Sequence, residues 1–139
     1  MILSFKKQFI EPILSGSKIH TIREDKNNRW KSGRSIQFAD GVRTKLYNEF
    51  KSGTCISTQT IEFKWTKHND GLVSESWAVE LFIDGKNVMY KMDDFNGTTL
   101  TEKIALNDGF KDVKEFFEWE AWNKKNFKGK LIHWTDTKY

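Results

Sequence analysis

The sequence predicts an α+β domain in which short strands form a curled sheet or barrel and three helices pack against it. Apolar residues alternate over short stretches that are separated by hairpin signals such as Asp40-Gly41 and Asp84-Gly85. Helical spacing occurs once near the N-terminus and twice in the last third of the chain. The 139 residues suit a single domain over 1–139, and the chain contains no repeat, linker or low-complexity stretch.

The first expected element is a helix over residues 5–15. Its apolar side chains recur at helical spacing, and Gly16 is a natural C-terminal cap. Pro12 is compatible with this helix only if the helix starts late or if the proline lies in its first turn. Residues 18–24 then favour a strand, because they are rich in β-branched side chains.

Alternating apolar side chains and turn signals predict five further strands. They are expected at residues 35–39, 42–46, 55–66, 77–83 and 87–92. In the longest of them the alternating face slips near Thr60-Ile61, which indicates a bulge. A last strand is expected at residues 130–134. We expect these strands to curl into the barrel.

Two helices are expected before the last strand. Thr99 and Glu102 form a capping-box pattern that predicts a helix over 99–107. Asp112 opens a second helix over 112–125 in a similar way. The apolar residues of this second helix form a wide stripe, Val113, Phe116, Phe117, Trp119 and Trp122. We place both tryptophans of the stripe in the core.

Composition favours a folded protein of the cytoplasm. Aromatic residues make up 14% of the chain, whereas disordered chains are poor in them. The single cysteine, Cys55, cannot form an internal disulfide, which indicates either a reducing compartment or a fold that does not depend on redox conditions. The N-terminal apolar run is too short for a signal peptide, and no segment has the length of a membrane span. We therefore expect a soluble cytoplasmic protein, and we assume a monomer.

Positive charge is concentrated in the first half of the chain. Residues 1–70 contain 13 Lys and Arg against 7 Asp and Glu, whereas residues 71–139 contain 10 against 12. Six of the basic residues lie within 18–34. A local positive field attracts anions, including the phosphates of nucleic acids. The plainer alternative is a solubilising surface on which the charges cluster by chance.

The residue types that hold metals and common cofactors are too sparse to form a site. His20, His68 and His133 lie far apart in the sequence, and only one cysteine accompanies them. The chain also lacks the glycine-rich loops that cradle phosphates in P-loop and dinucleotide-binding proteins. We therefore expect no metal and no cofactor.

Several short motifs follow one another in the order found in a known family. A helix ending in a Gly-Lys turn precedes a Thr-Ile-Arg strand, in the run Ile13-Leu14-Ser15-Gly16-Ser17-Lys18-Ile19-His20-Thr21-Ile22-Arg23. Further on come Trp30 before Gly33, the run Gly41-Val42-Arg43-Thr44-Lys45, and Asn107-Asp108-Gly109-Phe110 before Phe116-Phe117. This layout resembles that of ASCH domains, which are relatives of the PUA RNA-binding fold. The resemblance covers most of the chain except about residues 66–92, and it implies a PUA-like barrel with an RNA-related role.

One branch of the ASCH family implies a reaction. Its members are small amidohydrolases that remove the acetyl group from N4-acetylcytidine with a Lys, a Thr and a Glu. The first two match Lys18 and Thr21, and the Glu position matches Asp108, whose side chain is one methylene shorter. Lys18 and Thr21 would point to opposite faces of a regular strand. They converge if Lys18 lies in the turn after Gly16 or if the strand is bulged.

Other residues near these motifs are candidates for binding an RNA or a modified nucleoside. Arg23 and Arg43 suit phosphate or carboxylate recognition, and Lys45 belongs to the same basic run as Arg43. Trp30 could stack on a base, and His20 could contact the ligand. Each has a structural alternative, which is an ion pair for the arginines, core packing for Trp30 and an ordinary strand position for His20.

Three hypotheses follow for the function. The first is a binding module whose basic cleft holds RNA or a modified nucleoside. The second is an amidohydrolase that acts on an acylated nucleoside through Lys18, Thr21 and Asp108. The third is a structural or regulatory domain without a ligand. The amidohydrolase hypothesis requires the Lys18 nitrogen, the Thr21 hydroxyl and the Asp108 carboxylate to line one pocket.

Overall fold

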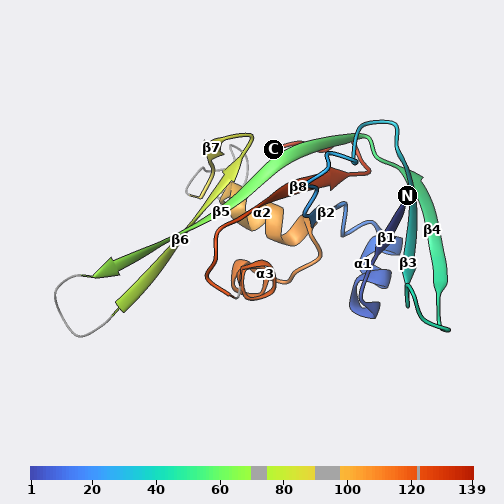
Figure 1. Cartoon of the computed structure of the whole chain (residues 1–139), viewed down its shortest axis with the longest axis horizontal. Coiled ribbons are helices and arrows are strands. Elements are labelled where there is room, and N and C mark those ends of the chain that lie inside the picture. The colour runs from blue at the N-terminus through green and yellow to red at the C-terminus, as the bar shows by residue number, and fades with distance from the viewer. Residues whose placement is uncertain (70–74, 90–97, 122) are drawn as a thin grey trace.

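The computed structural model describes residues 1–69, 75–89, 98–121 and 123–139 (Figure 1). The described strands form two separate sheets, and three helical segments pack against them. The α+β class predicted from the sequence is therefore confirmed, as is the placement of one helix near the N-terminus and two near the C-terminus. Of the predicted alternatives, a curled sheet or a barrel, the described residues do not form a closed barrel, because no strand of one sheet pairs with a strand of the other.

The smaller sheet contains three strands in the order β1-β3-β4. Strand β1 (Ile2–Ser4) runs parallel to β3 (Ser35–Asp40), which pairs in the antiparallel sense with β4 (Asn48–Thr54). The 3-10 helix η1 (Lys7–Phe9) and helix α1 (Ile10–Ser15) follow β1.

The larger sheet contains five antiparallel strands in the order β2-β8-β5-β6-β7. These strands are β2 (His20–Arg23), β5 (Ser57–Asn69), β6 (Glu75–Ile83), β7 (Lys86–Asn87) and β8 (Phe127–His133). Helices α2 (Leu100–Asn107) and α3 (Val113–Glu120) lie beside this sheet, and the β5–β6 hairpin extends away from the body of the molecule (Figure 1). No helix of the described chain has the length and apolarity needed to cross a bilayer.

The helix starts follow the predicted caps. The Thr99 side chain accepts a hydrogen bond from the Glu102 backbone, and the Glu102 carboxylate accepts one from Thr99, so the capping box forms. Asp112 caps α3 through the Glu115 N–H. Pro12 lies in the first turn of α1, where its missing N–H leaves no helical bond unmade. Helix α3 ends at Glu120 rather than near residue 125.

The strand predicted at 42–46 is wrong. This segment is a tight loop, because the Thr44 backbone and hydroxyl both donate to the Gly41 carbonyl and Arg43 has a φ of +64°. The partner strand β4 starts only at Asn48, whose amide donates to the Asp40 carboxylate. Only the first residue of the strand predicted at 87–92 belongs to β7, and residues 90–92 lie outside the described chain. Trp122, which the sequence places on the stripe of the last helix, also lies outside it.

The bulge predicted near Thr60-Ile61 is also wrong. Strand β5 pairs with β8 without a shift of register from Ser57 to Phe63. The alternation is continuous, but polar Ser57 and Gln59 occupy buried positions on the same side as the apolar ones. Gln59 is satisfied there by hydrogen bonds to the Asp84 carboxylate and the Tyr139 backbone. The register shift lies instead in β3, between Phe38 and Ala39.

An aromatic cluster joins the two sheets. Phe38 of β3 is fully buried, and its ring centroid lies 4.9 Å from that of Trp134, which follows β8. Phe5 stacks on the same Phe38 ring at 5.9 Å and meets Trp134 edge-on. These rings pack the two sheets together, beside the Cys55-Ile56 link where β4 leads into β5 and the backbone bonds to the Arg34 and His133 carbonyls.

We expect Phe38→Ala to destabilise the protein by about 3–5 kcal/mol, because it removes the ring that both sheets share. Urea unfolding followed by tryptophan fluorescence measures this change. Leu46→Ala is the matched control, since Leu46 is 75% exposed and its truncation should change stability by less than about 0.5 kcal/mol. Equal effects of the two substitutions would show that the cluster does not connect the sheets.

A candidate active site at two helix ends

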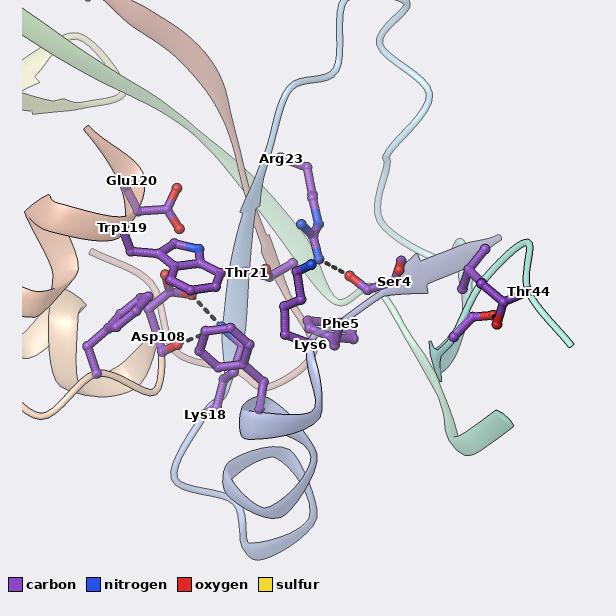
Figure 2. A pocket seen from close by; sticks show the side chains of 14 residues that line it. Ser4, Phe5, Lys6, Lys18, Thr21, Arg23, Thr44, Asp108, Trp119 and Glu120 are labelled. Atoms are coloured by element: carbon purple, nitrogen blue, oxygen red, sulfur yellow. Dashed lines mark hydrogen bonds and ion pairs between the residues drawn. The ribbon is translucent and has the colours of Figure 1, made fainter. Parts of the chain in front are cut away.

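A cavity of about 460 Å³ lies between the N-terminal helical segment, β2, the loop after β3 and the ends of α2 and α3 (Figure 2). Its walls combine aromatic rings with charged side chains. The aromatic part consists of Phe5, Phe9, Phe110 and Trp119. The polar part includes Lys18, Thr21, Arg23, Asp108 and Glu120. The cavity is large enough for a ligand of nucleoside size.

The end of helix α1 delivers Lys18 to the cavity. Gly16 closes the helix with a φ of +86°, a left-handed conformation that glycine adopts without steric cost. The chain then turns back, and the backbone N–H of Lys18 donates to the Pro12 carbonyl. Ile19 N–H donates to the carbonyl of Asn107, the last residue of α2. These bonds hold the segment after α1 against the end of α2.

The end of helix α2 delivers Asp108. Gly109 has a φ of +92°, and the N–H groups of Gly109 and Phe110 bond to the Leu106 and Ala105 carbonyls, as in a Schellman cap. A Cβ on Gly109 would lie 3.2 Å from the Lys18 side chain. Glycine at this position therefore both ends the helix and lets the lysine stem pass.

Lys18 and Asp108 form a buried ion pair. The Lys18 Nζ lies 2.7 Å from Asp108 Oδ1 and 2.6 Å from the Asp108 carbonyl, and both residues are at most 2% exposed. Burial lowers the pKa of the Lys18 amine, and the Asp108 charge opposes this shift. Burial would raise the pKa of Asp108, but Lys18 and His20 hold it below its usual value.

Strand β2 brings Thr21 and Arg23 to the same cavity. They are two residues apart, so they share one face of the strand, while Lys18 precedes the strand and reaches the cavity from the turn. This resolves the problem of the three-residue spacing between Lys18 and Thr21 without a bulge. Arg23 donates to the Ser4 carbonyl, and the Thr21 hydroxyl forms no hydrogen bond with any described residue.

His20 lies on the opposite face of β2 and does not line the cavity. Its Nδ1 is 3.3 Å from Asp108 Oδ1, and its Nε2 is 2.7 Å from the Tyr139 hydroxyl, which accepts from the Asn107 amide at 2.9 Å. Burial lowers the pKa of His20 against the opposing effect of the Asp108 carboxylate, and these neighbours favour a hydrogen on Nδ1. His20 therefore contacts the Asp108 carboxylate from the side away from the cavity.

Two cavity residues escaped the sequence analysis. Trp119, predicted to be a core residue, is 43% exposed and packs edge-on against Phe9 at 5.3 Å. Glu120 ends α3 and lines the cavity with it. The signal for Glu120 was its position four residues after the buried Phe116, because a carboxylate at that spacing falls on the apolar face of the helix.

The remaining candidate residues lie elsewhere. Trp30 is 6% exposed in the core, and its backbone N–H donates to the Asp25 carboxylate. Arg43 is exposed and lines a neighbouring hollow with Tyr47, and Lys45 is exposed on the same loop. In the part of the chain that the structure describes, no three His, Cys, Asp or Glu side chains converge as metal ligands would.

Comparisons with models of known protein families, with curated proteins and with solved structures give no match to this chain. The resemblance to ASCH domains therefore stays a prediction from the sequence.

We expect Asp108→Asn to destabilise the fold by about 3–5 kcal/mol at neutral pH, because it leaves the buried Lys18 amine without its counter-charge. The double variant Lys18→Met, Asp108→Asn should recover part of this loss. Urea unfolding of the three proteins gives the coupling energy between the two positions. A fully additive double variant would exclude a coupled pair.

The same pair predicts a pH dependence. Because the folded-state pKa of Asp108 lies below its unfolded value, its stabilising contribution is complete above the unfolded pKa, near 3.9, and is lost as pH falls through the folded value. Asp108→Asn should lack this part of the acid dependence. Unfolding curves between about pH 2 and pH 6 measure it, and parallel curves for both proteins would contradict the assignment.

Proposed function

We propose that this protein is a small amidohydrolase that removes an acyl group from the amino group of a nucleobase, on a fold related to ASCH and PUA-like domains. One observation carries the proposal, which is that Lys18, Thr21 and Asp108 line the same cavity. The amidohydrolase hypothesis required this arrangement of residues that lie 90 positions apart in the chain. N4-acetylcytidine is the substrate on which the proposal can be tested.

Thr21 is the candidate nucleophile. Thr21 lines the cavity, and no hydrogen bond joins its hydroxyl to another described residue, so the hydroxyl is available to a substrate carbonyl or to a base. A threonine hydroxyl is a weak nucleophile until a neighbouring group takes its proton. Attack on the carbonyl carbon would form an ester with the acyl group and would release the amine of the base.

Lys18 is the candidate base. A neutral lysine amine has two hydrogens and one lone pair, and two acceptors, the Asp108 carboxylate and the Asp108 carbonyl, are already in place for the hydrogens. The lone pair is then left for the Thr21 proton. Burial lowers the pKa of Lys18 and increases the neutral fraction, and Asp108 stabilises the ammonium that forms after proton transfer.

The aromatic walls suit a flat ring. The Phe9, Phe110 and Trp119 rings meet one another at centroid distances between 5.3 and 6.1 Å. Stacking on such side chains is a general way to hold an unpaired base. Arg23 lines the same cavity, and its remaining N–H groups can stabilise negative charge on the carbonyl oxygen during attack.

We expect the purified protein to convert N4-acetylcytidine to cytidine and acetate, measured by liquid chromatography. Thr21→Val keeps the β-branched shape of this strand residue but removes the hydroxyl, and it should lower kcat by at least about 10²-fold. Ser17→Ala is the matched control, because Ser17 lies beside the site but does not line the cavity. Full activity of Thr21→Val would exclude Thr21 as the nucleophile.

A second candidate function is the binding of RNA without hydrolysis. The hollow that contains Arg43 and Tyr47 shares Ser4 and Val42 with the cavity, so the two lie side by side. An exposed arginine beside an exposed tyrosine suits a phosphate and a neighbouring base.

If this second function holds, the affinity for a single-stranded RNA oligonucleotide should fall as salt rises, because phosphate contacts release counterions. Arg43→Ala should weaken binding and lower the slope of log K against log salt by about one unit. Fluorescence anisotropy measures both. Binding that does not depend on salt would remove the electrostatic basis of this function.

A further inference from the structure

Two carboxyl groups line the cavity, and they lie in different surroundings. Asp108 follows helix α2 and is 1% exposed, whereas Glu120 is the last residue of α3 and is only partly buried. Figure 2 shows both, with the Glu120 carboxyl beside Trp119 at the edge of the site. Pairs of acidic groups whose environments differ in this way often divide the acid and base roles of a reaction.

Asp108 cannot supply a proton. Its Oδ1 accepts from the Lys18 amine at 2.7 Å and faces His20 Nδ1 at 3.3 Å. These contacts favour the carboxylate over the acid, as the lowered pKa of Asp108 also indicates. The role of Asp108 is therefore to orient and stabilise Lys18.

Glu120 has the opposite surroundings. It accepts no hydrogen bond and forms no ion pair with any residue in the described part of the chain, although it lines the cavity. Burial, together with the negative charge of Asp108, raises its pKa to about 8, against the opposing effect of Lys18 and Arg23. The surroundings of Glu120 therefore favour its protonated form more than those of an ordinary surface glutamate do.

We propose that Glu120 is the general acid of the site and donates its proton to the leaving nitrogen when the amide bond breaks. The inference rests on the proposed amidohydrolase function. An amide needs such a donor, because an unprotonated amine anion is a very poor leaving group. Of the cavity carboxyls, Glu120 is the one whose oxygens are not already held by protein donors.

Every proton that moves during the full reaction has a donor and an acceptor. In the first half, the Thr21 hydroxyl proton moves to Lys18, the Thr21 oxygen bonds to the acyl carbon, and the Glu120 proton moves to the nitrogen as the C–N bond breaks. In the second half, Glu120 takes a proton from the attacking water and Lys18 returns its proton to the Thr21 oxygen. The products are a free amine and a carboxylic acid, and every group regains its starting state.

The test compares two substrates in wild type and in Glu120→Gln. The substrates are N4-acetylcytidine, whose leaving amine needs a proton, and 4-nitrophenyl acetate, whose leaving phenolate does not. We expect Glu120→Gln to lower kcat on the amide by about 10²–10⁴-fold and to change the rate on the ester less than about tenfold. The wild-type rate on the amide should also fall as pH rises through about 8, and this limb should be absent in the variant.

Glu118→Gln is the matched control, since Glu118 is an exposed residue of the same helix that pairs with Lys114. It should keep both activities, and circular dichroism should show all variants folded. Equal losses on both substrates in Glu120→Gln would overturn the acid role, because a merely structural residue does not distinguish leaving groups. A wild type that hydrolyses neither substrate would instead overturn the proposed function, so the two failures are distinguishable.

Discussion

A lysine and an aspartate that lie 90 residues apart in the sequence share one buried site, and the arrangement of the molecule depends on their pairing. Each charge is stabilised by the other at this depth, because the loss of hydration costs several kcal/mol per ion. The pair requires the turn after α1 and the end of α2 to meet, which in turn places β2 against α2 and α3. Lys18, Asp108 and Phe110 line the cavity from the two segments that this contact brings together.

Both partners reach the site by the same local device. Gly16 and Gly109 each end a helix in the left-handed conformation, so each functional side chain is presented at the end of a rigid element. The hydrogen bond from Ile19 to the Asn107 carbonyl ties the two helix ends directly to each other. His20 and Tyr139 then support the aspartate from the side away from the cavity.

Much of the local structure could be predicted because its causes are local. The caps at Thr99 and Asp112, and the Asp84-Gly85 turn, depend on neighbours within a few residues. The regular pairing of β5 could not, since polar side chains such as Gln59 are buried by partners from distant segments. The separation into two sheets likewise depends on which distant strands pair, and the alternation of apolar and polar residues within one strand does not specify this.

The candidate site could likewise be predicted from the sequence only in part. Lys18, Thr21 and Asp108 could be selected from a motif order, and the structure brings these three together. Trp119 and Glu120 were missed because the direction of a helix face depends on what the helix packs against. Trp119 belongs to the apolar stripe by spacing, yet its ring borders the cavity instead of the core.

The strand order has a consequence for synthesis on the ribosome. Strand β8 is the last strand in the sequence, but it lies between β2 and β5, and in the described chain β2 pairs with no other strand. As the chain emerges from its N-terminus, β2 must therefore wait for more than 100 further residues before it can pair, and the closure of that long loop carries an entropic cost. Lys18, next to β2, likewise meets its buried partner Asp108 only after 90 further residues have been added to the chain.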